Sequence, residues 1–477
     1  MITHVPSGSP PTKLSGGRAR TGRIPPGPRG LPFLGSLPAL GRDVLGFFTQ
    51  CARQYGDVTG FQLAAWPAVL LNHPGLVEGV LVKNHQNFVK HRFFWRHVEA
   101  VFGQGLLTSE GEFWHRQRRL AAPAFAGSRL SGYGETMVRH TERMLQRWRP
   151  HQILDAHREA MALTLQIAAK TLFNAEADQD VAEVSRALDD LMEEIAVRFR
   201  RPFWIPDAIP LPGNLRYRRS VQRMNQLVAR IIQERHGMRE DRGDLLSLLM
   251  LSRDETGQPM SERQVRDEVI TMLLAGHETT ALTLSWTWYL LGLHPDVDEE
   301  LAEEVRVVLR GRAPTADDVP RLRFTGQVVT ESMRLYPPAY AIGREARADC
   351  EIGGYRVPAG TTVYVSPWVM HRDPRWYDDP QAFRPERWSG DLAKQLPRFA
   401  YMPFGGGPRI CIGNRFAVME ATLILATVAQ RFRLEWQRSR PVQPMPSITL
   451  RPKGGVWVEL MSRSARDVVR GHRHGEG

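Results

Sequence analysis

The chain has 477 residues, of which 42% are hydrophobic, so it is long enough to bury a core of ordinary density. Three widely separated cysteines, Cys51, Cys350 and Cys411, exclude a disulfide-rich fold and favour a reducing compartment, so we expect a cytoplasmic protein. The formal charge of +12 suits an anionic surface or an acidic protein partner, but no nucleic-acid-binding motif accompanies it, and we expect no nucleic-acid partner.

Both ends of the chain are basic and poor in large apolar side chains. Residues 1–23 are rich in Ser, Gly, Pro and Arg, so we expect a disordered tail there, and a second basic tail over 463–477. A stiff proline-rich run over 25–32 leads into a single domain over 24–462. Neither an apolar signal region nor a run of about 18 apolar residues occurs, so we expect no secretory signal and no membrane anchor.

The first regular elements are predicted close to the proline-rich run. The residue pattern favours a helix over 44–55, a hairpin of strands over 58–63 and 68–72, and a helix from 73 to about 82. Residues 88–105 are unusually aromatic, and an aromatic core stripe is one interpretation of them.

A basic helix is predicted over 112–120. Trp114 and Arg118 are four residues apart and share one face of it, although alone this pattern is typical of a surface amphipathic helix. The chain over 135–250 is mostly helical by its periodicity. An interruption at 201–214 contains four prolines among apolar residues and predicts a loop.

A long central helix is predicted to begin at a capping box after Ser261 and to end near Leu291. Its middle breaks several local rules, because Gly276 and β-branched Thr279 weaken a helix and Glu278 is costly in apolar surroundings. Such conflicts tend to mark functional sites, and a core kink with a satisfied buried acid is the alternative.

Four charged residues follow with spacings that are weak evidence by themselves. Glu331 and Arg334 form an i, i+3 pair of the kind that many helices contain. Arg344 is, on this evidence alone, a surface arginine, and Arg387 follows in the run Pro385–Trp388. Short β-type runs are predicted over 351–357, 361–365, 432–436, 448–451 and 456–460.

The stretch Phe404–Gly413 delivers one cysteine from a glycine-rich turn. Three consecutive glycines and a proline form a tight loop, and Cys411 lies just before a predicted helix over 414–430. The helix N-terminus and Arg409 favour a thiolate at Cys411, and a thiolate is what a metal ligand must be. A buried structural cysteine is the alternative interpretation.

This loop meets the pattern Phe-x-x-Gly-x-Arg-x-Cys-x-Gly, and it resembles the haem-thiolate loop of the cytochrome P-450 monooxygenases. Four further stretches resemble motifs of that family, in the family's order, within residues 25–460: Trp-x-x-x-Arg at 114–118, Ala-Gly-x-Glu-Thr-Thr at 275–280, Glu-x-x-Arg at 331–334 and Pro-x-Arg at 385–387. Trp388 stands where Phe is usual, and we expect no functional effect of this difference.

The resemblance implies a mainly α fold with small β-sheets (α+β), in which haem b lies between the long central helix and the cysteine loop. It implies that Cys411 is the axial ligand of the iron. It also implies that Gly276 leaves room for dioxygen and that Thr279 and Glu278 deliver protons to it. The remaining implied haem-binding residues are Trp114, Arg118, Arg344, Phe404, Arg409 and Gly413, and the implied supporting network is Glu331, Arg334 and Arg387.

The implied reaction inserts one oxygen atom from O2 into a lipophilic small molecule: a terpene-like compound, a fatty acid, a steroid or a polyketide, as in secondary metabolism. No Gly-x-Gly-x-x-Gly fingerprint occurs, so we expect electrons from a separate ferredoxin- or flavodoxin-type donor that meets a basic face. The resemblance makes Phe94, Val98 and Phe102 candidates for the substrate pocket, roofed by the loop over 201–214. We expect a monomer.

Two other functions remain possible interpretations of the same residues. A haem-thiolate peroxygenase or isomerase would retain Cys411 but would not need Glu278 and Thr279. A non-enzymatic haem-binding protein would bind haem without turnover. A basic nucleic-acid-binding protein is a more distant alternative.

Overall fold

The computed structural model describes residues 22–91, 95, 98–175, 181–200, 205–235, 240–254 and 256–463. The predicted tails over 1–23 and 463–477 lie almost wholly outside these residues. At the described ends, Arg23 forms an isolated β-bridge with Tyr355, and Arg463 pairs with Asp298. Both ends of the described chain are therefore attached to the body of the protein.

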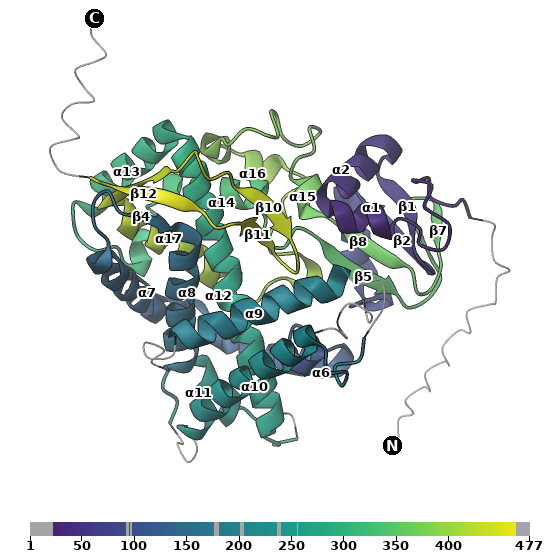
Figure 1. Cartoon of the computed structure of the whole chain (residues 1–477), viewed down its shortest axis with the longest axis horizontal. Coiled ribbons are helices and arrows are strands. Elements are labelled where there is room, and N and C mark those ends of the chain that lie inside the picture. Colours follow the sequence, from purple (N-terminus) through teal and green to yellow (C-terminus); the bar gives the residue numbers. More distant parts are fainter. Residues whose placement is uncertain are drawn as a thin grey trace, which may run out of the picture.

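Helices make up most of the body. In chain order they are α1 (Leu37–Arg42), α2 (Val44–Tyr55), α3 (Pro74–Glu78), α5 (Glu99–Phe102), α6 (Gly111–Ala121), α7 (Gly127–Arg147), α8 (Ala156–Phe173), α9 (Val181–Arg200), α10 (Pro212–Gln233), α11 (Leu245–Leu251), α12 (Glu262–Leu293), α13 (Pro295–Leu309), α14 (Arg323–Leu335), α15 (Pro367–Met370), α16 (Leu392–Gln395) and α17 (Asn414–Ala429). Figure 1 shows most of these helices gathered around α12, with α1 and α2 at one end.

The strands form small separate sheets. They are β1 (Val58–Leu63), β2 (Trp66–Leu71), β3 (Phe88–Val89), β4 (Ile153–Asp155), β5 (Ile342–Ala346), β6 (Cys350–Ile352), β7 (Tyr355–Val357), β8 (Thr362–Val365), β9 (Phe432–Trp436), β10 (Gln443–Pro446), β11 (Leu450–Lys453) and β12 (Trp457–Ser462). The largest sheet has the order β1-β2-β8-β5-β3, and a second has the order β4-β12-β9. The pairs β10-β11 and β6-β7 stand alone. The predicted mainly α fold with small sheets is confirmed.

The long helix α12 begins as the sequence predicts. The Ser261 side chain accepts the N–H of Gln264, and the Gln264 side chain accepts the N–H of Ser261, so both halves of the capping box are present. α8 and α17 pack against α12, and most of its residues from Val265 to Leu291 are buried. The helix therefore crosses the core, which explains why its sequence is apolar on every side.

The predicted helix over 44–55 and the following hairpin are confirmed by α2, β1 and β2. The predicted single run over 351–357 is instead a hairpin, because Gly353 and Gly354 adopt φ of +59° and +82° and turn the chain between β6 and β7. The strand β10 was missed, since Pro444 and Pro446 argue against a strand and are tolerated only where pairing is limited.

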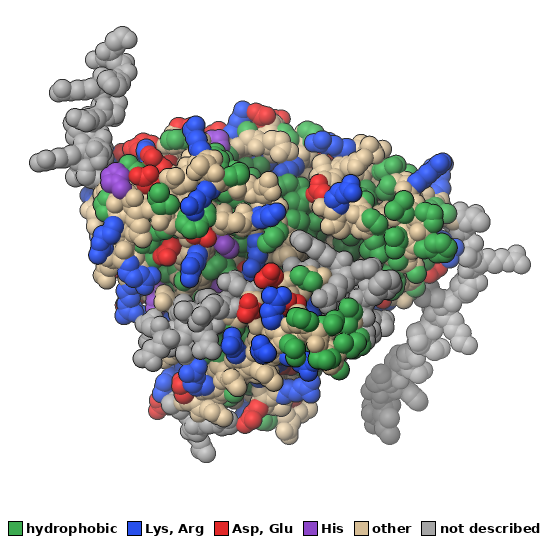
Figure 2. Space-filling model, viewed as in Figure 1, with side chains coloured by type: hydrophobic (Ala, Val, Ile, Leu, Met, Phe, Trp, Pro, Cys, Tyr) green, Lys and Arg blue, Asp and Glu red, His purple; other side chains and the backbone are tan. Residues whose placement is uncertain are grey.

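No helix in the described part of the chain is long and apolar enough to cross a membrane. Apolar side chains gather at the surface over α1, β1 and β2, as Figure 2 shows. Leu31, Phe33, Leu34 and Trp66 belong to this end of the molecule, and Phe33 is 97% exposed. The end that carries the largest sheet thus has a partly apolar exterior.

Candidate active site

The loop that carries Cys411 folds back on itself before α17. Gly405 and Gly407 have φ of +70° and +68°, where a side chain is strained. A Cβ on Gly407 would also lie 1.9 Å from the carbonyl oxygen of Leu81. The N–H of Cys411 donates to the carbonyl of Phe404 at 3.0 Å and closes the loop. The two glycines therefore fix the place of the thiol.

Cys411 lies two residues before Gly413, the N-cap residue of α17. Its side chain is accessible to water, yet protein atoms lie close enough for burial to raise the pKa of its thiol, while the N–H of Gly413 and the charge of Arg118 oppose the rise. The expectation that Arg409 supplies the stabilising charge is wrong, because the Arg409 guanidinium pairs with Glu110. Arg118 is the cation that acts on the thiol.

Trp114 and Arg118 lie on α6 and face the same side, as their spacing predicts. Trp114 is buried, and the Arg118 guanidinium carbon lies 5.7 Å from its ring centroid. Burial lowers the pKa of Arg118, and the nearby Cys411 opposes this. Among the described residues, neither the indole N–H of Trp114 nor the guanidinium of Arg118 has a hydrogen-bond acceptor. Both donors are therefore available to a ligand.

Arg344 brings a second guanidinium from β5, where it pairs in register with Val363 of β8. Its one hydrogen bond within the described chain runs from Nη1 to the Gly343 carbonyl at 2.8 Å. Burial and repulsion from Arg409 lower the pKa of Arg344 to about 10, with Glu110 opposing. No carboxylate of the described residues forms an ion pair with Arg344, which leaves it suited to an anion.

Two charged residues near these arginines escaped the sequence reasoning. Lys90 is buried, and its Nζ donates to the carbonyls of Leu106 and Ser109 at 3.1 and 2.8 Å. Glu110 accepts the N–H of Lys90 at 2.8 Å and also pairs with Arg409. A single Lys or Glu in a loop has no periodic pattern, so only its tertiary contacts identify it.

The middle of α12 has one accessible face. Between Asp267 and Trp288, all residues are buried except Ala275, Gly276 and Thr279, which share a face by their spacing. A Cβ on Gly276 would meet only a side-chain atom of Leu172, at 3.7 Å. Residues in the middle of a core helix are accessible only where packing leaves an opening beside it. Thr279 therefore borders such an opening, and its Oγ1 donates to the Ala275 carbonyl at 2.8 Å.

Glu278 is buried beside Thr279 but points to other partners. Its Oε1 accepts Thr449 Oγ1 at 2.7 Å and Arg451 Nε at 2.8 Å. Burial alone would raise the pKa of Glu278, but the charge and hydrogen bond of Arg451 lower it overall. Glu278 and Thr279 do not hydrogen-bond to each other. His277 next to them is buried, and burial lowers its pKa to about 4.

Glu331, Arg334 and Arg387 meet in one buried network. Arg334 donates to both oxygens of Glu331 at 2.8 Å, and Arg387 Nε donates to Oε1 at 2.9 Å. The Trp388 indole donates to Oε2 at 2.8 Å. Trp388 stands where the family usually has Phe, and Phe has no group that could make this bond. The expectation that this difference has no functional effect stays a prediction.

Of the three residues suggested for the substrate pocket, the structure describes two. Val98 and Phe102 are buried in the main hydrophobic core, while Phe94 lies outside the described residues. Of the loop over 201–214, residues 201–204 also lie outside them. In the described remainder, the Arg198 guanidinium donates to Asp207 at 2.6 Å. The structure thus gives Val98 and Phe102 a packing role.

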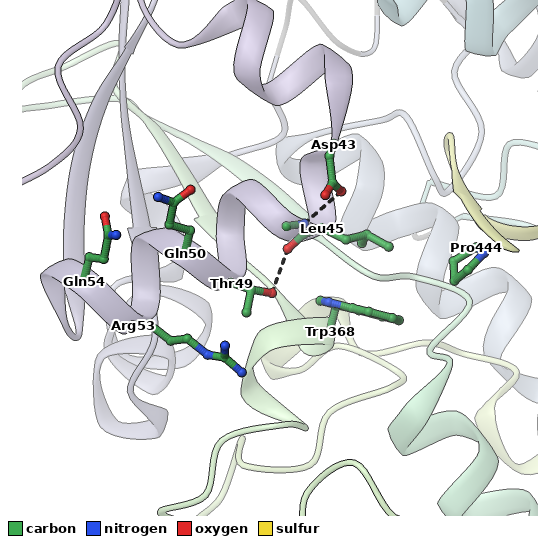
Figure 3. Close-up of a pocket in the computed structure, with 9 residues that line it drawn as sticks. Asp43, Leu45, Thr49, Gln50, Arg53, Gln54, Trp368 and Pro444 are labelled. Carbon is green, nitrogen blue, oxygen red and sulfur yellow. Dashed lines mark hydrogen bonds between the residues drawn. The ribbon is translucent and has the colours of Figure 1, made fainter.

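A surface pocket of about 680 Å³ lies away from these residues. Figure 3 shows Thr49 and Arg53 of α2 on one side of it and Trp368 and Pro444 on the other. None of the predicted site residues lines it. The pocket is therefore separate from the candidate active site.

The residues of the site fit a flat, doubly anionic cofactor with a thiolate-bound metal. The accessible Cys411 supplies the sulfur ligand, and Arg118 and Arg344 supply partly buried cations that lack carboxylate partners among the described residues. The accessible face at Gly276 and Thr279 supplies open space beside a core helix. Haem has the matching features, with an iron atom and two carboxylate side chains.

Residues 25–458 match the family model for cytochrome P-450. The chain belongs to the cytochrome P-450 family. It is 38% identical over 426 residues to cyclooctatin synthase of Streptomyces melanosporofaciens, covering 89% of this chain and 92% of that protein. It is also 38% identical to cyclooctat-9-en-7-ol 5-monooxygenase of the same organism (92% and 94% covered) and 34% identical to pentalenene oxygenase of Streptomyces avermitilis (92% and 97% covered).

The predicted function class is confirmed by this membership. The protein is a cytochrome P-450 monooxygenase that inserts one oxygen atom from O2 into a lipophilic small molecule, and its cofactor is haem b with a cysteine thiolate as axial ligand. A redox partner supplies its electrons. The peroxygenase, isomerase and non-enzymatic interpretations are therefore set aside.

Proposed function

We propose that Cys411 is the axial thiolate of this cytochrome P-450 and that Phe404 and Gly413 shape the loop around it. The observation that carries this proposal is an accessible cysteine beside Arg118, a guanidinium without a carboxylate partner among the described residues. Cys350 is the other cysteine with some exposure, but it lies in β6 of a two-stranded sheet, and the neighbouring charge that acts on its thiol is the carboxylate of Asp349. We further assign the haem propionates to Trp114, Arg118, Arg344 and Arg409.

Haem bound at this site supplies an iron centre that activates O2, and a thiolate ligand favours O–O cleavage. In the balanced reaction, one oxygen atom enters a C–H bond of the substrate and the other leaves as water, with two electrons and two protons consumed. Gly276 adds no side-chain atoms to the accessible face of α12. Thr279 holds a hydroxyl at that face, and Glu278 is the acid beside it that provides protons through solvent.

We propose a cyclic terpene hydrocarbon or terpene alcohol as the substrate. The support is the activity of two relatives, which act on cyclooctat-9-en-7-ol and pentalenene, together with coverage of about nine-tenths of each chain. Incubation of the enzyme with such hydrocarbons, and with a fatty acid as the comparison, tests this. Binding that displaces water from haem and yields a hydroxylated terpene is the expected result, while turnover of the fatty acid alone would contradict it.

The electron donor is proposed to be a separate acidic ferredoxin or flavodoxin. The formal charge of +12 supports attraction to an acidic partner. Rates of reduction should fall steeply between low and moderate ionic strength, since exposed charges are screened over about 10 Å at 0.1 M salt. A rate that does not respond to salt would oppose this assignment.

We also propose a cytoplasmic monomer with one catalytic domain over 24–462, supported by three sparse cysteines and one contiguous family match. Light scattering of the purified protein tests the monomer. A molecular mass near 54 kDa is expected, and a mass near twice that value would overturn it.

The deciding experiment compares Cys411→Ser with Cys350→Ser by the absorption spectrum of the reduced, carbon monoxide-bound protein. The wild type and Cys350→Ser should show the strongly red-shifted Soret band of thiolate-bound haem, and Cys411→Ser should lose it. Loss of the band in Cys350→Ser alone would overturn the assignment of Cys411.

Thr279→Ala tests the proton route, with Thr280→Ala as the neighbouring control on the same helix. Thr279→Ala should continue to consume O2 but release peroxide, with product per O2 falling about tenfold, because the hydroxyl at the accessible face is lost. Thr280 is buried and donates to the Gly276 carbonyl at 3.2 Å, so its variant should remain coupled. Equal coupling in both variants would remove Thr279 from the route.

A further inference from the structure

The side chain of Glu110 lies at the N-terminus of α6 but does not cap this helix. It occupies the N-cap position of α6, where an acidic side chain ordinarily accepts an N–H from the first turn, but its side chain forms no cap. Instead Oε1 accepts the N–H of Lys90 at 2.8 Å, and Oε2 accepts the guanidinium of Arg409. The carboxylate therefore connects α6 to two distant segments of the chain, those of Lys90 and Arg409.

These contacts hold Arg409 from three directions. Glu110 pairs with one end of its guanidinium, the Trp114 ring centroid lies 4.5 Å from its central carbon, and the Ser109 carbonyl lies 3.5 Å from Nη1. The Arg409 side chain is 17% exposed. A long side chain confined in this way has few alternative rotamers, so its orientation is fixed before it meets a ligand.

Glu110 is also a carboxylate whose charge acts on the neighbouring basic side chains Lys90 and Arg344. Burial and repulsion from Arg409 lower the pKa of Lys90 to about 6, and the same two causes act on Arg344. Glu110 opposes the shift at both residues. Without this negative charge, the guanidinium groups of Arg344 and Arg409 would have a larger positive field at the edge of the site.

We propose that Glu110 is a positioning residue of the haem site, which orients Arg409 toward the haem carboxylates and sets the net charge beside them. This inference rests on the proposed haem assignment at Cys411. Its consequence for the chemistry is that Glu110 holds the reduction potential of the iron more negative than the surrounding arginines alone would set it, because a nearby negative charge opposes the arrival of an electron.

The test uses Glu110→Gln and Glu110→Ala, with Glu112→Gln and Glu112→Ala as matched controls. Glu112 is an exposed acid in the first turn of the same helix. Gln at 110 has no charge, and its single carbonyl oxygen can still accept from Arg409, while its NH2 group cannot accept the N–H of Lys90; Ala removes both acceptors. The readouts are the reduction potential of the full-length haem protein and the rate of haem transfer to an apo-globin scavenger.

We expect both Glu110 variants to favour reduction, by about tenfold in the reduction equilibrium constant, because one unit of charge is removed from a partly buried cluster. Haem loss should stay near the wild-type rate in Glu110→Gln and rise roughly tenfold in Glu110→Ala, since only the latter frees Arg409. The Glu112 controls should match the wild type in both measurements.

Potentials and haem-loss rates equal to those of the Glu112 controls would overturn the inference, even if the Glu110 variants were thermally less stable. A wild-type protein without the red-shifted carbon monoxide band would overturn the haem assignment and the inference together. A wild type with that band, and Glu110 variants that behave as the controls do, would overturn the inference alone.

Discussion

Two buried carboxylates, Glu331 and Glu278, have opposite degrees of hydrogen-bond saturation. Both oxygens of Glu331 accept bonds from side chains, with Arg334, Arg387 and Trp388 as donors. Glu278 has both of its bonds on Oε1, and its Oε2 accepts none from the described residues. A saturated acid cannot rotate without losing several bonds, whereas a half-saturated acid keeps an oxygen available.

This difference distinguishes a structural role for Glu331 from the proposed catalytic role of Glu278. The Glu331 network links α14 to the turn at Pro385–Trp388 through donors that point at one acceptor from several segments. Such convergence makes a rigid base. Glu278 lies on the helix whose accessible face includes Thr279, and its Oε2 has no hydrogen-bond donor among the described residues. The same residue type thus holds the fold in one place and serves the proposed proton route in the other.

The largest effect is expected from Glu331→Ala, which breaks the saturated acid. Arg334 is fully buried and would be left with an uncompensated charge. We expect a loss of about 5 kcal/mol in the free energy of unfolding, measured by urea denaturation. Glu303→Ala, which breaks an exposed pair with Arg306, should cost less than about 1 kcal/mol. Similar losses in both variants would refute a supporting role for Glu331.

The variant Arg451→Met tests the charge of Glu278 through the pH dependence of the unfolding free energy. Since the pKa of Glu278 is lowered in the folded protein, its stabilising contribution is present above its unfolded pKa, near 4.3, and is lost as the pH falls through the lower folded pKa. Without Arg451, burial raises that pKa instead. The variant should be less stable by about 3 kcal/mol at pH 7, and the difference should shrink at pH 4.

Urea unfolding of both proteins at the two pH values measures this. A difference in unfolding free energy that is the same at pH 7 and pH 4 would show that the charge of Glu278 is not held by Arg451.

The variant Glu278→Gln tests the proposed role of Glu278 in proton delivery. It retains the size of the side chain but cannot release a proton, so we expect product formation to fall roughly 10²-fold, or about 2.7 kcal/mol in the barrier. The control is Asp298→Asn, which changes a buried acid of α13 that pairs with Arg463. This variant should keep the wild-type rate. An unchanged rate in Glu278→Gln would place the proton route elsewhere.

The smallest effect is expected from Trp388→Phe, which removes one donor and leaves the ring. Glu331 would lose a bond of 2.8 Å but keep both arginines. The unfolding free energy should fall by about 1.5 kcal/mol, the usual value for a bond to a charged group. A Trp388→Phe variant as stable as the wild type would mean that the two arginines alone saturate the acid.

Much of the local structure could be predicted from the sequence. The capping box at Ser261 fixes the start of α12, and the glycines at 405 and 407 are required by positive φ angles. The motifs also named Cys411, Thr279 and Glu331 for the site. These features depend on contacts within a few residues of the chain, and local residue order specifies such contacts directly.

The partners of the charged residues could not be predicted in the same way. Glu278 takes Arg451 from β11, 173 positions later in the chain, and Glu110 takes Arg409 from the cysteine loop. The sequence suggested Arg409 as the cation beside Cys411, but packing places Arg118 there. Sequence spacing contains no information on which strands and loops meet.

The sequence by itself therefore determined the fold class, and it supplied the proposed haem-thiolate loop and the proposed residues of the chemistry. Tertiary structure decided which charges pair, which acids are saturated and which face of α12 is accessible. The physical reason is the separation along the chain over which each kind of interaction acts. Backbone conformation and helix capping are set by neighbours in the chain, whereas burial and Coulomb interactions act between any groups that folding brings together.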